Sequence, residues 1–128
     1  MQTGTKHEVK TTVTPALTAG SAGSGSLQVY ATPCMVALME QAAAELCQQY
    51  LDEGITTVGT ALNIQHLAAT GVGVEVRAVA TLLSFDGRKA VFEVEAYDNA
   101  GLIGKGTHER FTVKTDKLMQ KTIERAVK

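Results

Sequence analysis

The segment from Thr32 to Gly54 constrains the fold most, because it predicts one long helix in a chain whose other segments are mostly strand-like. The hydroxyl of Thr32 can accept an N-cap hydrogen bond, and Pro33 suits the first helical position. Gly54 supplies a matching helix stop. Residues 33–51 are apolar on nearly all sides in the first two turns, which predicts a central helix enclosed by other structure.

Strand-like segments lie on both sides of this helix. Residues 7–14 alternate, residues 19–26 form a Gly/Ser-rich loop whose composition favours flexibility, and residues 27–31 are short and extended. After the helix, β-branched content or alternation predicts four strands, at residues 58–67, 74–85, 89–98 and 102–114.

Turn residues set the order of the last three strands. Asp86-Gly87 predicts a two-residue hairpin turn, and residues 99–101 (NAG) predict a three-residue one, so these strands form an antiparallel meander. Residues 115–128 indicate a short polar helix or a frayed tail.

One long helix with two short strands before it and four long strands after it predicts an α+β domain of the hotdog type, in which an antiparallel sheet wraps the helix. A ferredoxin-like fold is the alternative, but it needs a second core helix between strands, and residues 54–114 contain no such pattern. The length of 128 residues predicts a single domain covering 1–128.

Charge and cysteine content exclude several classes of function. A net charge of -1 with interspersed basic and acidic residues predicts neither a nucleic-acid partner nor an anionic membrane. Cys34 and Cys47 lie about 20 Å apart along one predicted helix and cannot form a disulfide with each other. With a polar start to the chain, we expect a soluble cytoplasmic protein that binds a small molecule or a protein.

Three polar side chains, Thr32, Glu40 and His66, stand among apolar neighbours where no structural rule asks for them. Glu40 follows seven uncharged residues, and a carboxylate buried without partners costs several kcal/mol. These residues are therefore the candidates for a functional site.

Five segments around these residues occur in an order and spacing that resemble the fluoroacetyl-CoA thioesterase-like family of hotdog proteins. They are residues 29–33 (VYATP), 39–40 (ME), 58–61 (VGTA), 66–70 (HLAAT) and 106–110 (GTHER). Each is a weak signal alone, and the resemblance runs from about residue 27 to residue 114.

The resemblance implies a homodimeric thioesterase that hydrolyses a small or short-chain acyl-CoA, with Thr32, Glu40 and His66 as the catalytic residues. It also places Gly59 where a backbone N–H meets the substrate carbonyl, and Arg110 beside the acyl pocket. Coenzyme A is part of the substrate, and we expect no cofactor and no metal. One departure is residues 21–26 (SAGSGS), where the fluoroacetyl-selective type has aromatic side chains over the pocket.

Each candidate also has a purely structural interpretation. Glu40 could pair with Arg77 or Arg110, Thr32 could serve only as the N-cap, and His66 could be a core residue on a strand face shared with Val58, Thr60, Leu62 and Ile64. Gly59 could only let the strand approach the helix.

The sequence leaves some chemistry open. Cys34, near the predicted start of the helix, offers a rival nucleophile, although its apolar surroundings favour a core residue. Glu40 could act as a nucleophile or as a base toward water, with His66 as its acid/base partner. A non-catalytic dimer that binds acyl-CoA is the alternative function, and a hydratase acting on the acyl chain is a third.

Overall fold

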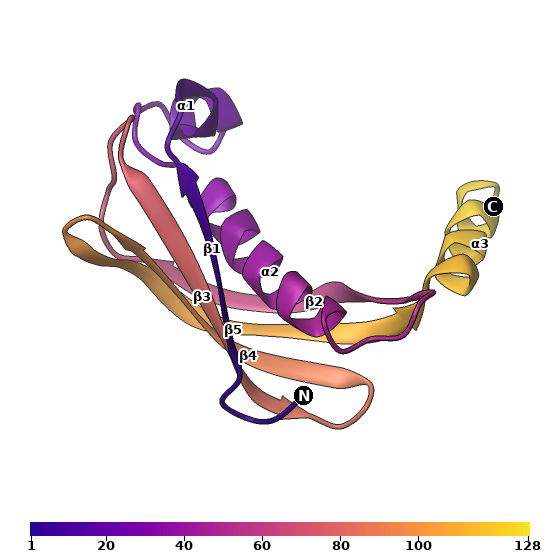
Figure 1. Ribbon diagram of the computed structural model, residues 1–128. Coiled ribbons are helices and arrows are strands. Elements are labelled where there is room, and N and C mark those ends of the chain that lie inside the picture. Colours follow the sequence, from indigo (N-terminus) through magenta and orange to yellow (C-terminus); the bar gives the residue numbers. More distant parts are fainter.

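The computed structural model describes all 128 residues as one sheet, one long helix and short flanking helices (Figure 1). The chain runs β1 (Lys6–Thr12), η1 (Pro15–Leu17), α1 (Ala19–Ala22), α2 (Thr32–Gln48), β2 (Ile55–His66), β3 (Glu75–Phe85), β4 (Lys89–Asp98), β5 (Gly101–Lys114) and α3 (Thr115–Ala126).

The five strands form a single antiparallel sheet in the order β1-β3-β4-β5-β2. The predicted meander β3-β4-β5 is confirmed, and β2 pairs with β5 on one side only, which leaves β2 at an edge. No second helix lies between the strands that follow α2. The α+β hotdog prediction is therefore confirmed, and the ferredoxin-like alternative is excluded.

Both hairpin turns differ slightly from prediction. Asp86 N–H donates to the Lys89 carbonyl at 3.2 Å, so the two central residues are Gly87 and Arg88, one position later than expected. Asp86 Oδ1 accepts from the N–H groups of Arg88 at 2.9 Å and Lys89 at 2.7 Å, which favours this placement. The second turn has two central residues instead of three, because Asp98 pairs with Gly101.

The helix α2 lies along the concave face of the sheet, and its apolar side forms the core with the strands beneath it (Figure 1). Alternate residues of β3 and β4 face this helix, as expected for strands with one buried side. The core members from α2 are Met35, Leu38, Met39, Ala42, Ala43, Leu46 and Cys47.

The prediction that other structure encloses the first turns of α2 on nearly all sides is wrong for the single chain. Pro33 and Ala37 are exposed and Val36 is partly exposed, so one face of the first turns lies open. The helix also ends at Gln48, six residues before Gly54, which instead takes a positive φ of 83° in the following turn.

The Gly/Ser-rich segment contains more regular structure than its composition predicts. Residues 19–22 form the helical turn α1, closed by Gly23 with a φ of 77°. Backbone bonds from Ala19 to Val29 and from Gly20 to Leu27 tie this turn to the extended segment before α2.

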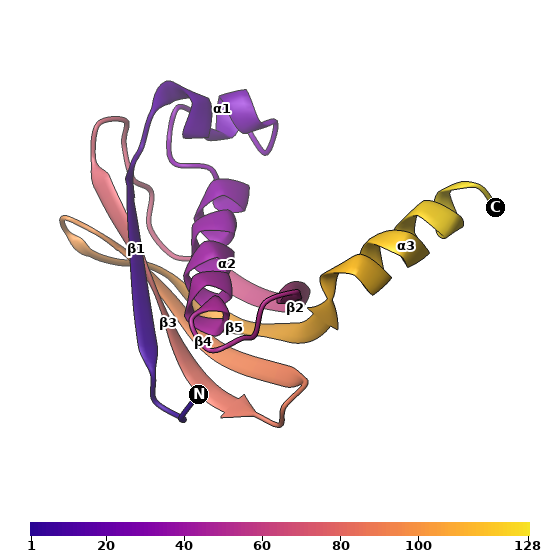
Figure 2. The same ribbon diagram turned by 45° about the vertical axis from the view of Figure 1, so that its right-hand side comes forward.

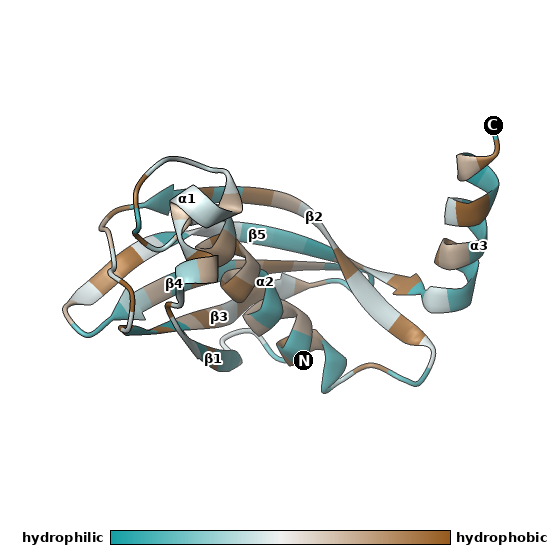
Figure 3. Ribbon diagram, turned by 90° about the horizontal axis from the view of Figure 1, so that it is seen from above, coloured by the Kyte–Doolittle hydropathy of each residue, from teal (hydrophilic) through white to brown (hydrophobic).

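At the other end of the chain, α3 extends away from the sheet (Figure 2) and none of its residues is buried. Apolar and polar residues alternate along it (Figure 3). No helix of the chain combines the length and hydropathy required to cross a bilayer.

Candidate functional site

Two of the three candidate catalytic residues contact each other. Thr32 lies in the first turn of α2 and His66 is the last residue of β2, and Thr32 Oγ1 lies 2.8 Å from His66 Nδ1 in a hydrogen bond. The N-cap is Ala31, and Thr32 makes no cap bond. The structural interpretation of Thr32 as an N-cap is therefore wrong, and its hydroxyl is committed to His66.

The second ring nitrogen of His66 has no partner. His66 Nε2 is buried and makes no hydrogen bond, which is unusual for a buried polar atom. Burial lowers the pKa of His66 below its ordinary value, and the Ala68 backbone opposes part of this shift. A neutral imidazole anchored through Nδ1 has Nε2 left to exchange a proton with a bound molecule.

A pocket of about 300 Å³ lies at this pair. Its walls come from α1, the segment before α2 and the residues after β2, and both Thr32 and His66 line it. Most of the lining is apolar, including Val29, Tyr30 and Leu67. A small apolar group could therefore lie beside the hydroxyl and the imidazole.

Glu40 lies elsewhere on α2. Its side chain keeps 37% of its accessible surface, and Oε2 lies 3.6 Å from Arg110 Nη1. The carboxylate is thus neither fully buried nor unpartnered in the single chain, in contrast to the prediction from its apolar neighbours. Of the two basic residues considered as partners, Arg110 is the one found, because Arg77 pairs with Glu8 at 3.1 Å.

Gly59 lets the strand approach the Glu40 carboxylate. A Cβ at this position would lie 2.7 Å from Glu40 Oε2 and 3.2 Å from Arg110 Nη1. Any side chain here would displace the ion pair, which is sufficient reason for a glycine. The role of its N–H as a donor to the substrate stays a prediction.

Arg110 is buried, and each of the three nitrogens of its guanidinium has a partner. Nε donates to Thr57 Oγ1 at 2.8 Å, Nη2 donates to the Thr57 carbonyl at 3.0 Å, and Nη1 lies 3.2 Å from His108 Nε2. Burial lowers the pKa of Arg110, and Glu40 opposes that shift. The sequence did not single out Thr57 as a member of this cluster.

A β-bulge explains an error in the predicted strand face. Gly59 pairs with Arg110 and Ala61 pairs with Glu109, which leaves Thr60 as an extra residue. Such an insertion reverses which residues face the helix. Before the bulge, Thr57 and Gly59 face the helix and Val58 lies on the opposite face. After the bulge, the residues that face the helix are Leu62, Ile64 and His66.

Within one chain the three candidates therefore form two groups. The Glu40 carboxylate lies against Gly59, whereas His66 is seven residues further along β2, about 20 Å away at the rise of a strand. Glu40 makes no hydrogen bond to Thr32 or to His66. The predicted convergence of all three side chains does not occur inside a single protomer.

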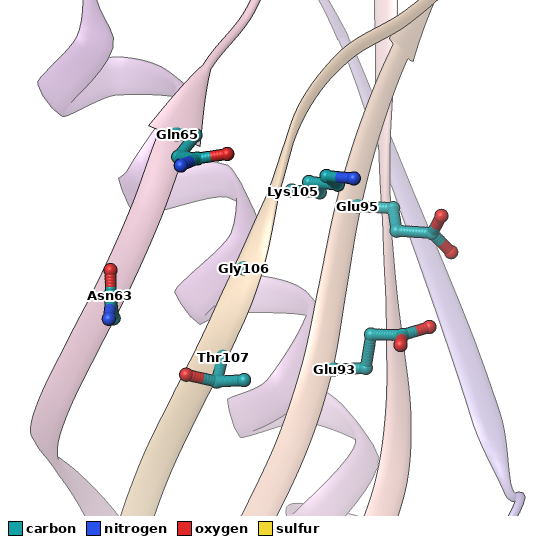
Figure 4. Close-up of a pocket in the computed structure, with 7 residues that line it drawn as sticks. All are labelled: Asn63, Gln65, Glu93, Glu95, Lys105, Gly106 and Thr107. Carbon is teal, nitrogen blue, oxygen red and sulfur yellow. The ribbon is translucent and has the colours of Figure 1, made fainter.

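The other candidates are separate from these two groups. Both cysteines are free, and Cys34 is only partly exposed. No three His, Cys, Asp or Glu side chains come close enough to hold a metal ion. A pocket of about 480 Å³ on the face of the sheet away from α2 has polar walls and contains none of the candidate catalytic residues (Figure 4).

Known proteins similar to this chain are thioesterases. Residues 13–116 match the family model described as fluoroacetyl-CoA-specific thioesterase. The fluoroacetyl-CoA thioesterase of Streptantibioticus cattleyicolor is 40% identical over 94 residues, which cover 73% of this chain and 68% of that protein.

Solved structures agree with the sequence match. A crystal structure of the fluoroacetyl-CoA-specific thioesterase FlK is 33% identical with a TM-score of 0.92, covering 98% of this chain and 97% of that one. A thioesterase superfamily member from Thermus thermophilus is also 33% identical, with a TM-score of 0.87 and coverage of 97% and 94%. A FlK structure in complex with fluoroacetate and CoA matches with a TM-score of 0.86 and 34% identity over 92% of this chain and 99% of that one.

Proposed function

The chain belongs to the family of fluoroacetyl-CoA-specific thioesterases, and on that basis we propose that it hydrolyses the thioester bond of a small acyl-CoA. It is a thioester hydrolase of the hotdog fold. Within the structure, the observation that supports this function best is the Thr32–His66 hydrogen bond beside a small apolar pocket, with His66 Nε2 left without a partner.

The proposed active site is shared between two protomers of a homodimer. Glu40 and Gly59 come from one protomer, and Thr32 and His66 come from its partner. Three features of the single chain support a partner of this kind, namely the free edge of β2, the open face of α2 and the apolar side of α3.

The edge of β2 is long and unprotected. The strand has 12 residues, pairs with β5 on one side only, and is exposed over most of its second half. Unpaired edges of this length are usually covered in soluble proteins, since their N–H and C=O groups recruit another strand. A second copy pairing antiparallel along β2 would cover both edges by symmetry.

One register of this pairing would unite the two groups. If Asn63 lies opposite the Asn63 of a second copy, the helix-facing residues of both strands fall on one side of the joint sheet. Thr60 has no pairing partner, so Gly59 is the third pairing position from Asn63 in the direction of the bulge. His66 is the third position in the other direction, so Gly59 of one copy would lie opposite His66 of the other. Directly opposite residues are about 5 Å apart, so the Glu40 carboxylate of one protomer would reach His66 of the other.

The remaining apolar surface also favours a second copy. The open face of α2 around Pro33 and Ala37 adjoins Thr32 at one end and Glu40 at the other. Met119 and Ile123 on α3, and Val127 directly after it, are spaced four residues apart and are 52%, 58% and 83% exposed. An exposed apolar stripe on a helix that has no buried residue indicates a partner surface.

In the proposed reaction, Glu40 attacks the thioester carbonyl or removes a proton from the attacking water. Attack by Glu40 expels coenzyme A as a thiolate and forms an anhydride, which water then cleaves to release the carboxylic acid and restore the carboxylate. Attack by water gives the same products in one addition and elimination. Backbone N–H groups at Gly59 or in the first turn of α2 would stabilise the oxyanion.

Thr32 and His66 would carry out the proton transfer of this reaction. The neutral imidazole, oriented by the threonine hydroxyl, accepts a proton from the attacking water or delivers one to the departing thiolate through Nε2. No metal or redox cofactor takes part in these steps, and coenzyme A enters only as part of the substrate.

We propose weak discrimination between fluorinated and other small acyl groups. Residues 21–26 contain no aromatic side chain and all are exposed, so they add no apolar wall over the pocket. The cytoplasm is the proposed location, because coenzyme A thioesters are intracellular metabolites.

Thiol release from a panel of acyl-CoAs, including acetyl-, propionyl- and fluoroacetyl-CoA, tests the function. We expect stoichiometric release of thiol and carboxylic acid, with similar kcat/KM for acyl groups of similar size and electrophilicity. Saturable binding without turnover would support the non-catalytic binding protein instead. A changed acyl chain on an intact thioester would support a hydratase.

A further inference from the structure

The buried imidazole of His108 carries a definite proton arrangement. His108 lies on β5, has no exposed surface, and stacks on Phe92 with ring centroids 6.2 Å apart. Its Nδ1 is 2.8 Å from the carbonyl oxygen of Ala61, the first residue after the bulge. Because a carbonyl oxygen only accepts, Nδ1 must donate and therefore holds the proton.

The other nitrogen is then an acceptor for Arg110. In the neutral ring, His108 Nε2 has a free lone pair, and Arg110 Nη1 donates to it at 3.2 Å. Burial lowers the pKa of His108, the Ala61 bond opposes this, and Arg110 lowers it further, while Glu40 and Glu109 oppose the shift. These effects together favour the neutral ring on which this arrangement depends.

Three bonds fix the plane of the guanidinium. Two go to Thr57 of β2 and the third goes to His108, and the same Nη1 that meets His108 is the atom 3.6 Å from Glu40 Oε2. Thr57 alone would hold the Nε and Nη2 side of the group. The bond to His108 determines where Nη1 points, and so where the Glu40 carboxylate rests against Gly59.

We propose that His108 is a positioning residue of the thioesterase: its neutral imidazole aims Arg110 at the Glu40 carboxylate. The inference rests on the proposed role of Glu40 and extends it, because His108 touches no substrate and acts only through Arg110. Protonation of His108 would place a second donor against the guanidinium and would disturb the same contact.

Three variants separate positioning from packing. In His108→Gln the side-chain oxygen can occupy the place of Nε2 and accept from Arg110. His108→Asn retains a donor for the Ala61 carbonyl but does not reach Arg110, and His108→Phe retains the ring stacked on Phe92 and loses both hydrogen bonds. Circular dichroism and thermal unfolding show which variants fold.

We expect His108→Asn and His108→Phe to lower kcat about 10- to 100-fold with KM changed less than about threefold, since a misplaced reactive group lowers turnover more than binding. His108→Gln should retain most of the turnover. Folded His108→Asn and His108→Phe variants with wild-type kcat would overturn the inference.

Combination with Glu40→Gln distinguishes this inference from the proposed function. If His108 acts through Glu40, His108→Phe lowers the residual turnover of the Glu40→Gln variant little further. An equal further loss would mean that His108 acts by another route and would overturn its role. Full activity of Glu40→Gln alone would instead refute the proposed role of Glu40.

A measurement on the resting protein tests the proton arrangement without reference to activity. In ¹⁵N-labelled protein, His108 should show a protonated Nδ1 and an unprotonated Nε2 at and above pH 7, where the lowered pKa favours the neutral ring, assigned by comparison with His108→Gln. A proton on Nε2 throughout this range would leave no acceptor for Arg110 and would rule out the proposed arrangement.

Discussion

The two ends of β2 present opposite kinds of polar cluster. Around the bulge, the guanidinium of Arg110 is bound by Thr57, His108 and Glu40, and Gly59 admits the carboxylate. At the far end, Thr32 and His66 share one hydrogen bond and His66 Nε2 has no partner. One cluster holds a carboxylate in a fixed position, whereas the other has an unused proton-transfer atom.

The difference indicates that neither cluster is a complete active site. A hydrolase needs a nucleophile or base, a proton carrier and a place for the acyl group together. In the proposed reaction the bulge cluster would supply the first, and the His66 cluster would supply the other two, next to the apolar pocket. Two copies of the chain paired along β2 would complete both sites at once.

The largest expected effect comes from removing the carboxylate. Glu40→Gln retains the shape of the side chain but is a poor nucleophile and base, so kcat should fall about 10³-fold or more while KM changes little. Thiol release under saturating acyl-CoA measures this. Glu45→Gln, on the same helix and paired with His7 at the surface, is the matched control and should be active.

Turnover by Glu40→Gln equal to wild type would remove Glu40 from the reaction. The bulge cluster would then be a structural ion-pair network only. The contrast between the two clusters would no longer have a catalytic meaning.

The second largest effect is expected from removal of His66 Nε2, the ring nitrogen without a partner. His66→Asn can retain a contact to Thr32 but has no atom at the position of Nε2, so we expect kcat to fall about 10²- to 10³-fold. His7→Asn, at a partly exposed histidine, is the control and should leave kcat unchanged. Wild-type turnover by His66→Asn would mean that solvent, and not His66, carries the proton during the reaction.

The pH dependence follows from the lowered pKa values of two histidines, the partly buried His66 and the buried His108. Because burial lowers the pKa of His66 below the reference value of 6.5, its neutral form persists at neutral pH and is lost only as the pH falls through the lowered value. We expect kcat/KM to fall about tenfold per pH unit on that acid limb.

Stability should follow the same sign. The unfolded chain binds protons on these histidines at a higher pH than the folded chain, so the free energy of unfolding decreases as the pH falls from 6.5 through the lowered pKa values. Thermal unfolding of wild type and His66→Asn across this range measures it. If the loss of stability at acid pH were the same in His66→Asn as in wild type, the titrating group would be a residue other than His66.

Thr32 has the smallest expected effect. Thr32→Val retains the shape and removes the hydrogen bond to His66, which should lower kcat about tenfold, and Thr32→Ser should restore most of it. Equal rates for the two variants would show that orientation of the imidazole does not depend on this bond.

The sequence predicted the fold well because its strongest signals are local. The apolar helix, the alternating strands and the hairpin residues each determine structure within a few positions, and the β3-β4-β5 meander follows from two short turns. The errors fell where tertiary contacts override local preference. Backbone bonds to Leu27 and Val29 order the Gly/Ser segment, and α2 ends before Gly54.

The site was less predictable from sequence. The Thr32–His66 contact joins residues 34 positions apart, and only the resemblance to a known family associated them. An isolated strand glycine such as Gly59 marks either a bulge or a close backbone approach, and the sequence does not say which. The bulge at Thr60 reverses the faces of β2 and sets the distance from Gly59 to His66. Thr57 was missed because nothing in its local sequence distinguishes a ligand of a buried arginine from an ordinary strand residue. The two-residue spacing of His108 and Arg110, in contrast, puts both on one face of a strand.

Mixing two inactive variants tests the shared site most directly. If Glu40 of one protomer works with Thr32 and His66 of the other, a mixed dimer of Glu40→Gln and His66→Asn contains one intact site, and random exchange of subunits restores about a quarter of wild-type activity. We expect that recovery after co-refolding of equal amounts, and none from either variant refolded alone. If each protomer built its own site, every site in the mixture would carry one defect, and an absence of recovery in proven mixed dimers would contradict the shared site.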